Sequence, residues 1–298
     1  MPPHLYFVTS AVFHYLGPAF AVLLFARIEP LGIAWLRIAS AALVFTLWRR
    51  PWRFFLRLAR ADRRAVIGLG FVLALMNASF YLALRHLPLA TVGAIEFLGP
   101  IGLAAFGMRT ARNWSALIVS VLGVYLLTNP ALGAQAVGYL FAFLNCGLFV
   151  LYIVLGHKIA GGGEASGIDR LGMAMIVALI VAFPIGVLDA APAFTDPLIL
   201  AAAIGVGISS SVIPYVCDQL AMARLPRASF ALLLALLPAT ATIIGVIVLR
   251  QIPTATDLLG IGLVAIAVAI HRPDDKAETA GDGDDPAAGG HRFGPGQP

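Results

Sequence analysis

Residues 80–100, FYLALRHLPLATVGAIEFLGP, align without a gap with residues 218–238, DQLAMARLPRASFALLLALLP. Each stretch places Pro at the same two positions around an apolar segment. The identical pairs are Leu82 with Leu220, Ala83 with Ala221, Leu87 with Leu225, Pro88 with Pro226, Ala90 with Ala228, Leu98 with Leu236 and Pro100 with Pro238. The chain therefore contains an internal repeat with an offset of 138 residues.

Apolar segments of membrane-spanning length surround the repeat. Of the 298 residues, 60% are hydrophobic and only 12% are charged, whereas soluble domains are about one quarter charged. A bilayer core about 30 Å thick accommodates a helix of about 20 apolar residues. Ten such segments occur, at 5–25, 31–48, 65–84, 89–107, 114–128, 135–156, 171–188, 197–221, 228–249 and 257–270. None alternates in polarity as barrel strands do, so the sequence predicts an all-α integral membrane protein with ten transmembrane helices.

The spacing of the repeat predicts how its two copies are oriented. Five predicted spans make up one copy, and an odd number of crossings inserts the second copy upside down. A weaker match pairs WLRIASAALV with IDRLGMAMIV and places Arg37 opposite Arg170. We therefore expect two five-helix inverted repeats, at 1–130 and 131–272, followed by a disordered polar tail at 273–298. Inverted repeats are typical of secondary transporters, in which substrate binds near the midplane between the halves.

The distribution of positive charge predicts the orientation in the membrane. Sixteen of the twenty Lys and Arg residues fall in loops on one side, and only Arg27, Arg37, Arg85 and Arg250 fall on the other. By the positive-inside rule, both termini of this multi-pass chain lie on the cytoplasmic side of the cell membrane. This rule explains the net charge of +5 without a nucleic-acid partner. The arginine-rich stretch 49–64 is expected to lie on the anionic inner leaflet and anchor the second and third spans, or alternatively to form a basic amphipathic helix that binds a regulator.

Several of these segments are similar to a known family. LPLAT and LPRAS each open a span with Pro twelve residues after the first Pro, and EFLGP (96–100) and SSVIPYVCDQLAMARLP (210–226) accompany them. Over about residues 5–270 the chain resembles the EamA-like transporters of the drug/metabolite transporter superfamily, and within them the threonine/homoserine exporter branch. The resemblance implies export of small amino-acid-like metabolites by proton exchange. Many members have Glu where this chain has Leu237 and Arg250, which implies that coupling is arranged differently here.

Glu96 is the first candidate for a functional residue, because an ionisable side chain at bilayer depth costs at least about 2.5 to 3.5 kcal/mol. It is the eighth residue of the fourth predicted span, which places it near the midplane. We interpret it as the group that binds a substrate ammonium or takes up a proton. The alternative is a structural role in a hydrogen bond to a neighbouring helix.

Polar residues on other predicted spans form a second set of candidates. Gly207, Ser211, Tyr215 and Asp218 follow helical spacing and share one face. Pro214 beside them is expected to kink the helix and free a carbonyl that could bind substrate or an ion. Asp218 lies nearer the helix end, where a solvated position explains it equally well. The remaining candidates are Asn77 and Tyr81 on the third span, Asn145 and Tyr152 on the sixth, and His14 on the first, where a packed histidine is the alternative to a proton relay.

Other functional classes have weaker support. Ser209, Ser210 and Ser211 with His14 are the candidates for an intramembrane enzyme, but they lack a G-x-S-x-G context. No Walker motif supplies ATP chemistry, and the two cysteines lack metal-ligand spacing, so no metal or cofactor is expected. The expected partners are a small-molecule substrate, the lipid bilayer and protons. Efflux of drugs or other amphipathic compounds is the alternative function, and the oligomeric state does not follow from the sequence.

Overall fold

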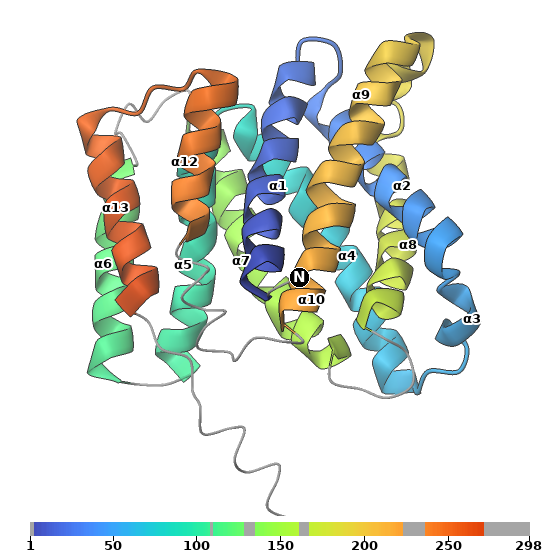
Figure 1. The fold of residues 1–298 in the computed structure, drawn as a ribbon, viewed down its shortest axis with the longest axis horizontal. Helices are drawn as coiled ribbons and strands as arrows, with labels where there is room; N and C mark the ends of the chain where they lie inside the picture. Colours follow the sequence, from blue (N-terminus) through green and yellow to red (C-terminus); the bar gives the residue numbers. More distant parts are fainter. Residues whose placement is uncertain (1–2, 108–109, 128–134, 161–166, 223–235, 271–298) are drawn as a thin grey trace, which may run out of the picture.

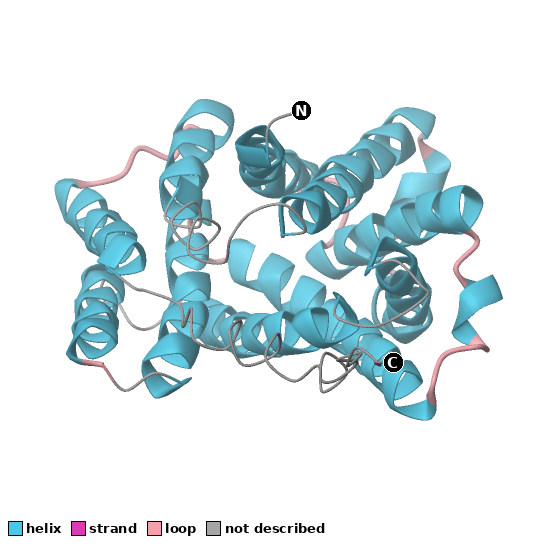
Figure 2. Ribbon diagram, turned by 60° about the horizontal axis from the view of Figure 1, so that its bottom comes forward, coloured by secondary structure: helices cyan, strands magenta, loops and turns pink. Residues whose placement is uncertain are grey.

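The chain folds into a bundle of helices (Figures 1 and 2). The computed structural model describes residues 3–107, 110–127, 135–160, 167–222 and 236–270, and within these ranges it contains no strand. The prediction of an all-α fold is confirmed. The elements are α1 (Pro3–Leu24), α2 (Pro30–Arg49), α3 (Trp52–Phe55), α4 (Arg60–Leu84), α5 (Leu89–Gly107), α6 (Ala111–Leu127), α7 (Ala136–Ala160), α8 (Gly167–Gly186), η1 (Ala191–Thr195), α9 (Pro197–Gly207), η2 (Ile208–Val212), α10 (Ile213–Met222), α12 (Leu236–Leu249) and α13 (Ala255–Ile270).

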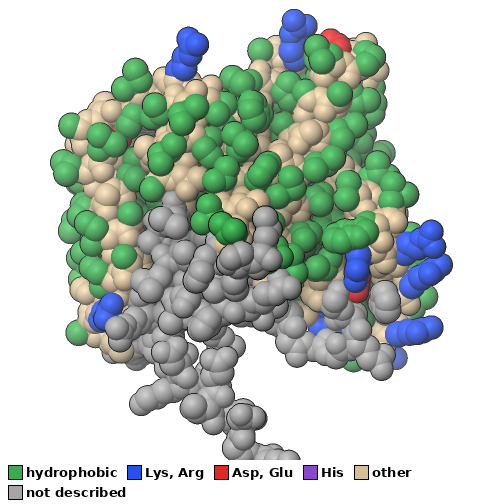
Figure 3. All heavy atoms as spheres, viewed as in Figure 1, with side chains coloured by type: hydrophobic (Ala, Val, Ile, Leu, Met, Phe, Trp, Pro, Cys, Tyr) green, Lys and Arg blue, Asp and Glu red, His purple; other side chains and the backbone are tan. Residues whose placement is uncertain are grey.

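The helices have the lengths and surfaces of membrane spans. By length and composition, α2, α4, most of α7, α8 and the continuous column from α9 through α10 can each cross a membrane. Five further apolar helices, parts of α1, α5 and α12 together with α6 and α13, are shorter. Large apolar side chains such as Leu47, Leu140 and Ile247 are exposed, and hydrophobic atoms are spread over the side of the bundle in Figure 3. Such a surface is stable against lipid and unstable against water.

Each predicted span overlaps one helix or helical column. The helices that match the fifth and tenth spans begin earlier than predicted, since α6 begins at Ala111 and α13 begins at Ala255. The eighth span is interrupted by the π-helical turn η2, which the regular spacing did not anticipate. The start of the ninth span, most of the second repeat stretch, and the tail lie outside the described residues.

The arginine-rich stretch 49–64 is not one helix, so the alternative of a single amphipathic helix that binds a regulator is wrong, whereas its location on the inner leaflet stays a prediction. The helix α2 ends at Arg49, and Arg50 adopts a left-handed conformation with φ 49°. A single helical turn, α3, follows, and α4 begins at Arg60. Left-handed backbone ends a helix because it turns the chain out of the helical path. The arginines are therefore divided among two helix ends and a short connecting turn.

Helix pairings follow a regular pattern across the bundle. The pairs α2 with α8, α5 with α12, and α6 with α13 each join helices five spans apart. Several other pairs occur twice: α4 packs on α7 as α1 packs on α10, α5 on α7 as α12 on α1, and α4 on α8 as α2 on α9. In the α6–α13 pair the backbones approach so closely that a Cβ on Gly123 or on Gly260 would lie 2.7 Å from the other residue's carbonyl oxygen.

Candidate functional site

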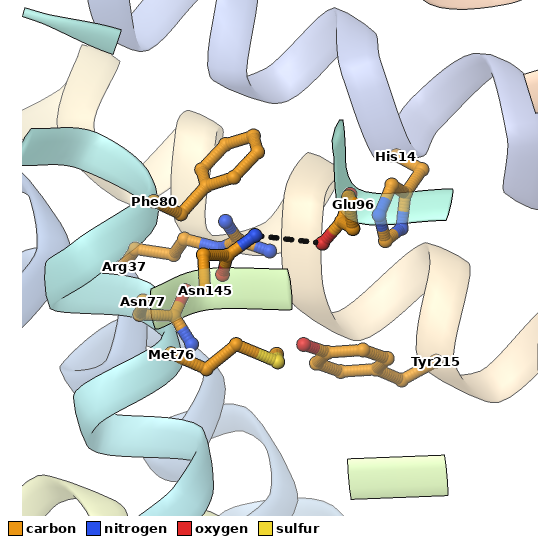
Figure 4. Close-up of a pocket in the computed structure, with 8 residues that line it drawn as sticks. All are labelled: His14, Arg37, Met76, Asn77, Phe80, Glu96, Asn145 and Tyr215. Carbon is orange, nitrogen blue, oxygen red and sulfur yellow. Dashed lines mark hydrogen bonds between the residues drawn. The ribbon is translucent and has the colours of Figure 1, made fainter. Parts of the chain in front are cut away.

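A small cavity lies inside the bundle, between helices of the two halves (Figure 4). The first half of the chain lines it with His14 of α1, Arg37 of α2, Met76, Asn77 and Phe80 of α4, and Glu96 of α5. The second half adds Asn145 of α7 and Tyr215 of α10. Glu96, Asn145 and Arg37 are each the eighth or a later residue of their helices, about 10 Å or more from the helix starts. We call this set of eight residues the central cavity.

Arg37 is buried in α2 with only 5% of its surface exposed. The charge count placed it in an outer loop, and that placement is wrong, because Arg37 lies at the eighth residue of a twenty-residue helix. Its Nε donates a hydrogen bond of 2.7 Å to Ser211 Oγ, and its Nη2 donates one of 2.7 Å to the Ser210 carbonyl. The guanidinium also lies over the Tyr81 ring at 5.7 Å, a favourable cation–π position. The guanidinium is therefore held in one orientation by both halves of the chain.

Pro214 explains why the Ser210 carbonyl is available to Arg37. In an α-helix this carbonyl would accept a hydrogen bond from the backbone nitrogen four residues later, which is Pro214 and has no hydrogen. The chain relaxes into the π-helical turn η2, in which the Ile213 N–H donates to the Ile208 carbonyl. The freed carbonyl that Pro214 was expected to create is present, and its partner is the Arg37 guanidinium.

Close approach of three helices makes this contact possible. A Cβ on Gly17 would lie 2.4 Å from Ser210 Cβ, and a Cβ on Gly207 would lie 2.5 Å from Ser40 Cβ. Glycine at these two positions therefore lets α1 and α2 pack directly on the column that contains η2. Any larger residue would move Ser210 and Ser211 away from Arg37.

Glu96 and Asn145 form the second polar contact of the central cavity. Asn145 Nδ2 donates a hydrogen bond of 3.1 Å to Glu96 Oε1, as Figure 4 marks with a dashed line. Glu96 is 3% exposed and Asn145 is fully buried. Within the described part of the chain, Glu96 Oε2 and Asn145 Oδ1 have no hydrogen-bond partner. Unpartnered buried acceptors are rare in native proteins because each is costly, so their presence calls for an explanation.

Tyrosine hydroxyls are the other unpartnered groups near the cavity. The hydroxyls of Tyr15, Tyr81 and Tyr215 are buried and have no partner among the described residues. The positive charge of Arg37 interacts electrostatically with Glu96 and with Tyr215. No Arg37 nitrogen lies within 4.0 Å of a Glu96 oxygen, so these two described residues do not form a direct ion pair.

The central cavity is narrow in this conformation. Its volume is about 20 Å³ for the centre of a water molecule, which is room for about one water. A metabolite of several heavy atoms needs the surrounding helices to move apart. The site is thus closed, and a ligand larger than water enters it only through a conformational change.

The structure brings together most of the residues that the sequence singled out. His14, Asn77, Glu96, Asn145 and Tyr215 line the central cavity, and Ser211 and Tyr81 contact Arg37 beside it. Asn77 Nδ2 donates to the Leu73 carbonyl of its own helix at 2.7 Å. Their role in transport remains a prediction.

Two further predicted residues, Tyr152 and Asp218, are not among the residues that line the central cavity. The Tyr152 ring is 5.8 Å from the Tyr215 ring and stacks on Phe149 at 5.8 Å. Asp218 is half-buried, and its carboxylate lies within hydrogen-bonding range of Ser10. Both therefore lie next to the site on its α10 side.

The sequence interpretation missed Arg37, Met76 and Phe80 as cavity residues. A signal for Arg37 was present, because a basic residue inside an apolar span is as costly as an acidic one. Nothing in the sequence distinguishes Met76 and Phe80 from the other apolar residues of the third predicted span.

Known proteins resemble this chain in sequence and in fold. Residues 136–271 match the EamA-like transporter family. The threonine/homoserine exporter RhtA of Escherichia coli (strain K12) is 29% identical over 254 residues, which cover 84% of each protein. RhtA of Salmonella typhimurium (strain LT2) shows the same identity and coverage. A protein of known crystal structure, 20% identical, matches the fold with a TM-score of 0.59 over 90% of this chain and 96% of its own.

These matches confirm the resemblance that the segments 96–100 and 210–226 indicated. The family match covers the second half of the chain, and the similarity to the exporters extends over both halves. The apolar helices agree with a membrane location. Residues 136–271 thus resemble the EamA-like transporter family, and the chain is a multi-pass membrane protein whose sequence is similar to threonine/homoserine exporters over most of its length.

Proposed function

We propose that the protein is a secondary active transporter that exports small amino-acid-like metabolites, related to threonine and homoserine, in exchange for protons. One observation carries the proposal: a buried carboxylate, Glu96, has an unpartnered oxygen in a polar cavity between the two halves of the bundle. A purely structural acid would have both oxygens satisfied. An acid at this position can bind an ammonium group or exchange a proton during the transport cycle.

The proposed mechanism uses two five-helix inverted repeats, 1–130 and 131–272, that move against each other. The pattern of helix pairings supports this arrangement, because many pairings between described helices recur when each helix is exchanged for the one five spans away. The cavity lies where α1, α2, α4 and α5 meet α7 and α10, which is where alternating access requires a binding site. The energy comes from an ion gradient, since the chain carries no Walker motif.

The orientation that we propose places both termini in the cytoplasm. The positive-inside bias supports it, and removing Arg37 from the outer group strengthens the bias from four outer charges to three. A topology reporter fused after Pro130 should be active in the periplasm, and one fused at Gly162 should be active in the cytoplasm. The reverse pattern would refute the orientation.

An export assay tests the proposed function directly. Cells that lack their own threonine and homoserine exporters should become resistant to toxic concentrations of these amino acids when they express the protein. Intracellular amino acid should fall in parallel, and the effect should disappear when a protonophore collapses the proton gradient. Unchanged sensitivity in cells with confirmed membrane insertion would contradict the proposal.

Efflux of drugs or other amphipathic compounds is the second candidate function. A run of aromatic rings favours it, since Phe97, Phe149, Tyr152 and Tyr215 follow one another at centroid distances of 5.8 to 6.4 Å. Aromatic surfaces bind flat apolar or cationic compounds. Resistance to such compounds without amino-acid export would identify this function.

A further inference from the structure

The central cavity contains charged and polar groups of opposite character on its two sides. On one side, Arg37 has Nε and Nη2 bound to Ser211 and Ser210, and its Nη1 makes no hydrogen bond to a residue that the structure describes. On the other side, Glu96 Oε2 and Asn145 Oδ1 are buried acceptors, and neither has a partner among the described residues. The cavity thus has a positively charged hydrogen-bond donor on one side and two hydrogen-bond acceptors on the other.

Arg37 and Glu96 do not neutralise each other by direct contact. They interact electrostatically, yet no nitrogen of one lies within 4.0 Å of an oxygen of the other. Two opposite charges in a low-dielectric interior attract each other strongly unless packing holds them apart. Here the serine contacts hold the guanidinium on the η2 side, and the Asn145 amide holds the carboxylate on the α7 side.

We infer that the central cavity is a clamp for a zwitterion, in which Arg37 binds a substrate carboxylate while Glu96 and Asn145 bind the ammonium group on the adjacent carbon. The inference rests on the proposed function and specifies its substrate class as free α-amino acids. The Arg37 guanidinium provides charge-assisted donors for a carboxylate, and two acceptor oxygens match the several hydrogens of an ammonium. The Tyr215 hydroxyl, buried and unpartnered, is placed to bond a hydroxyl on the substrate side chain.

The clamp explains why so many polar atoms remain unsatisfied in the closed cavity. A site built to hydrogen-bond a substrate group rejects an analogue that lacks the group, because its own buried polar atoms are then left unpaired. The protein should therefore discriminate against a plain amine and against a plain carboxylic acid of similar size. We expect no such discrimination from a transporter of amphipathic compounds.

Competition experiments on purified protein in proteoliposomes test the clamp. Counterflow of labelled L-threonine is measured against unlabelled L-threonine, against threoninol, which lacks the carboxylate, and against 3-hydroxybutyrate, which lacks the ammonium. Each analogue should compete at least about tenfold more weakly than threonine, because it leaves one charged group of the clamp unpaired. If threoninol competes as well as threonine, the clamp is wrong while threonine transport itself stands.

Substitutions assign each half of the clamp to its residues. In Arg37→Gln the ratio between threonine and threoninol should fall to within about twofold, while discrimination against 3-hydroxybutyrate is retained. Arg37→Lys should retain part of the discrimination against threoninol, because lysine keeps the positive charge but lacks the planar guanidinium group. Arg170→Gln is the matched control, since Arg170 is also buried but lies outside the cavity, and its ratio should equal that of the wild type. An unchanged ratio in Arg37→Gln would overturn the assignment.

Ligand-induced stabilisation separates failure of the clamp from failure of the proposed function. Threonine should raise the thermal unfolding temperature of the detergent-solubilised wild type more than either analogue does. If no amino acid is transported but threonine alone stabilises the protein, the transport function fails and the clamp stands. If all three compounds stabilise equally, or none does, the clamp fails. These measurements use the wild type, so they hold even where a variant fails to fold.

Discussion

Arg37 and Arg170 occupy matching positions in the weaker of the two internal alignments, and both are buried, but their surroundings differ. Arg170 lies in the first turn of α8, where Nη1 donates 2.5 Å to the Ile159 carbonyl and Nη2 lies 3.8 Å from Asp62. Arg37 lies about 10 Å into α2 and is held by neutral serine groups. One arginine has a carboxylate partner nearby, and the other faces a carboxylate that it does not touch.

The two regions around these arginines therefore have different roles. Beside Arg170, Arg49 Nε donates a hydrogen bond of 2.6 Å to Asp169 Oδ1, and its Nη2 donates one of 3.0 Å to Oδ2. We call these three residues together with Asp62 the end cluster. The opposite charges of the end cluster lie close to each other, as in a structural ion pair. In the central cavity the opposite charges of Arg37 and Glu96 are held apart, so they form no direct ion pair that would stabilise the protein without a ligand. The comparison teaches that opposite buried charges without direct contact, more than buried charge itself, distinguish a candidate binding site from a structural ion pair.

The largest effect is expected from Glu96→Gln in the central cavity. The amide keeps the acceptor for Asn145 and nearly the same shape, but it carries no charge and does not titrate. Proton-coupled export should fall to background while insertion and thermal stability are retained. The pH midpoint that a titrating carboxylate gives the wild-type activity should be absent from any residual activity of the variant. The groups that interact electrostatically with Glu96 are Arg37, Tyr15, Tyr215 and Cys146.

Glu29→Gln is the control for this prediction, because Glu29 is exposed and pairs with the exposed Arg85. It should transport at the wild-type rate. Transport by Glu96→Gln at the wild-type rate and with the same pH profile would exclude Glu96 as the coupling residue, and Asp218 would be tested next.

A smaller effect is expected from Pro214→Ala, which changes how Arg37 is anchored. Alanine restores a backbone N–H that can donate to the Ser210 carbonyl and favours a regular α-helix over the π-helical turn. Arg37 then loses one of its two anchors, so the transport rate should fall several-fold and the threonine-to-threoninol ratio should narrow. Pro184→Ala in α8 is the matched control, since Pro184 is also inside a helix but outside the cavity. Equal effects of the two substitutions would show that the anchor has no role.

In the end cluster, Asp169→Asn should affect stability and leave specificity intact. The substitution weakens the two hydrogen bonds from Arg49, and since Arg49 is one third exposed the free energy of unfolding should fall by about 1 to 2 kcal/mol. Thermal unfolding in detergent measures this loss, and the competition ratios should match those of the wild type. A changed ratio between threonine and threoninol would mean that the end cluster contributes to substrate recognition, which would contradict this prediction.

The smallest effect is expected from removing residues 274–298. This segment is polar, rich in Pro and Gly, and contains six of the fifteen acidic residues, so it has too little apolar surface to pack on the bundle. Expression, insertion and export of the truncated protein should equal those of the full chain. Lower export by a truncated protein present at normal levels would assign the tail a regulatory role.

The type and approximate bounds of the apolar helices could be predicted from sequence because burial in a bilayer is a local requirement. Each span must be apolar over about twenty residues, whatever its neighbours are. The same reasoning singled out Glu96, because an acid in an apolar span is visible without knowing what surrounds it. It also gave Pro214 its role as the residue that frees a carbonyl, since the missing N–H is a property of proline alone.

Only the tertiary structure decided which polar groups meet. Arg37 and Ser211 are 174 residues apart, and their contact depends on how α2 crosses the column that contains η2. The absence of a side chain at Gly17 and Gly207 allows the helices to cross there, because their backbones approach closely at these positions. A glycine in the sequence does not indicate which helix will pack against it until both helices are placed. The π-helical turn shifts the face on which Ser211 and Tyr215 lie relative to regular helical spacing. The hydrophobicity of a span is a property of one continuous segment, so the spans could be predicted from the sequence. The proposed clamp depends on how helices rotate and cross relative to one another, so only the tertiary structure could indicate it.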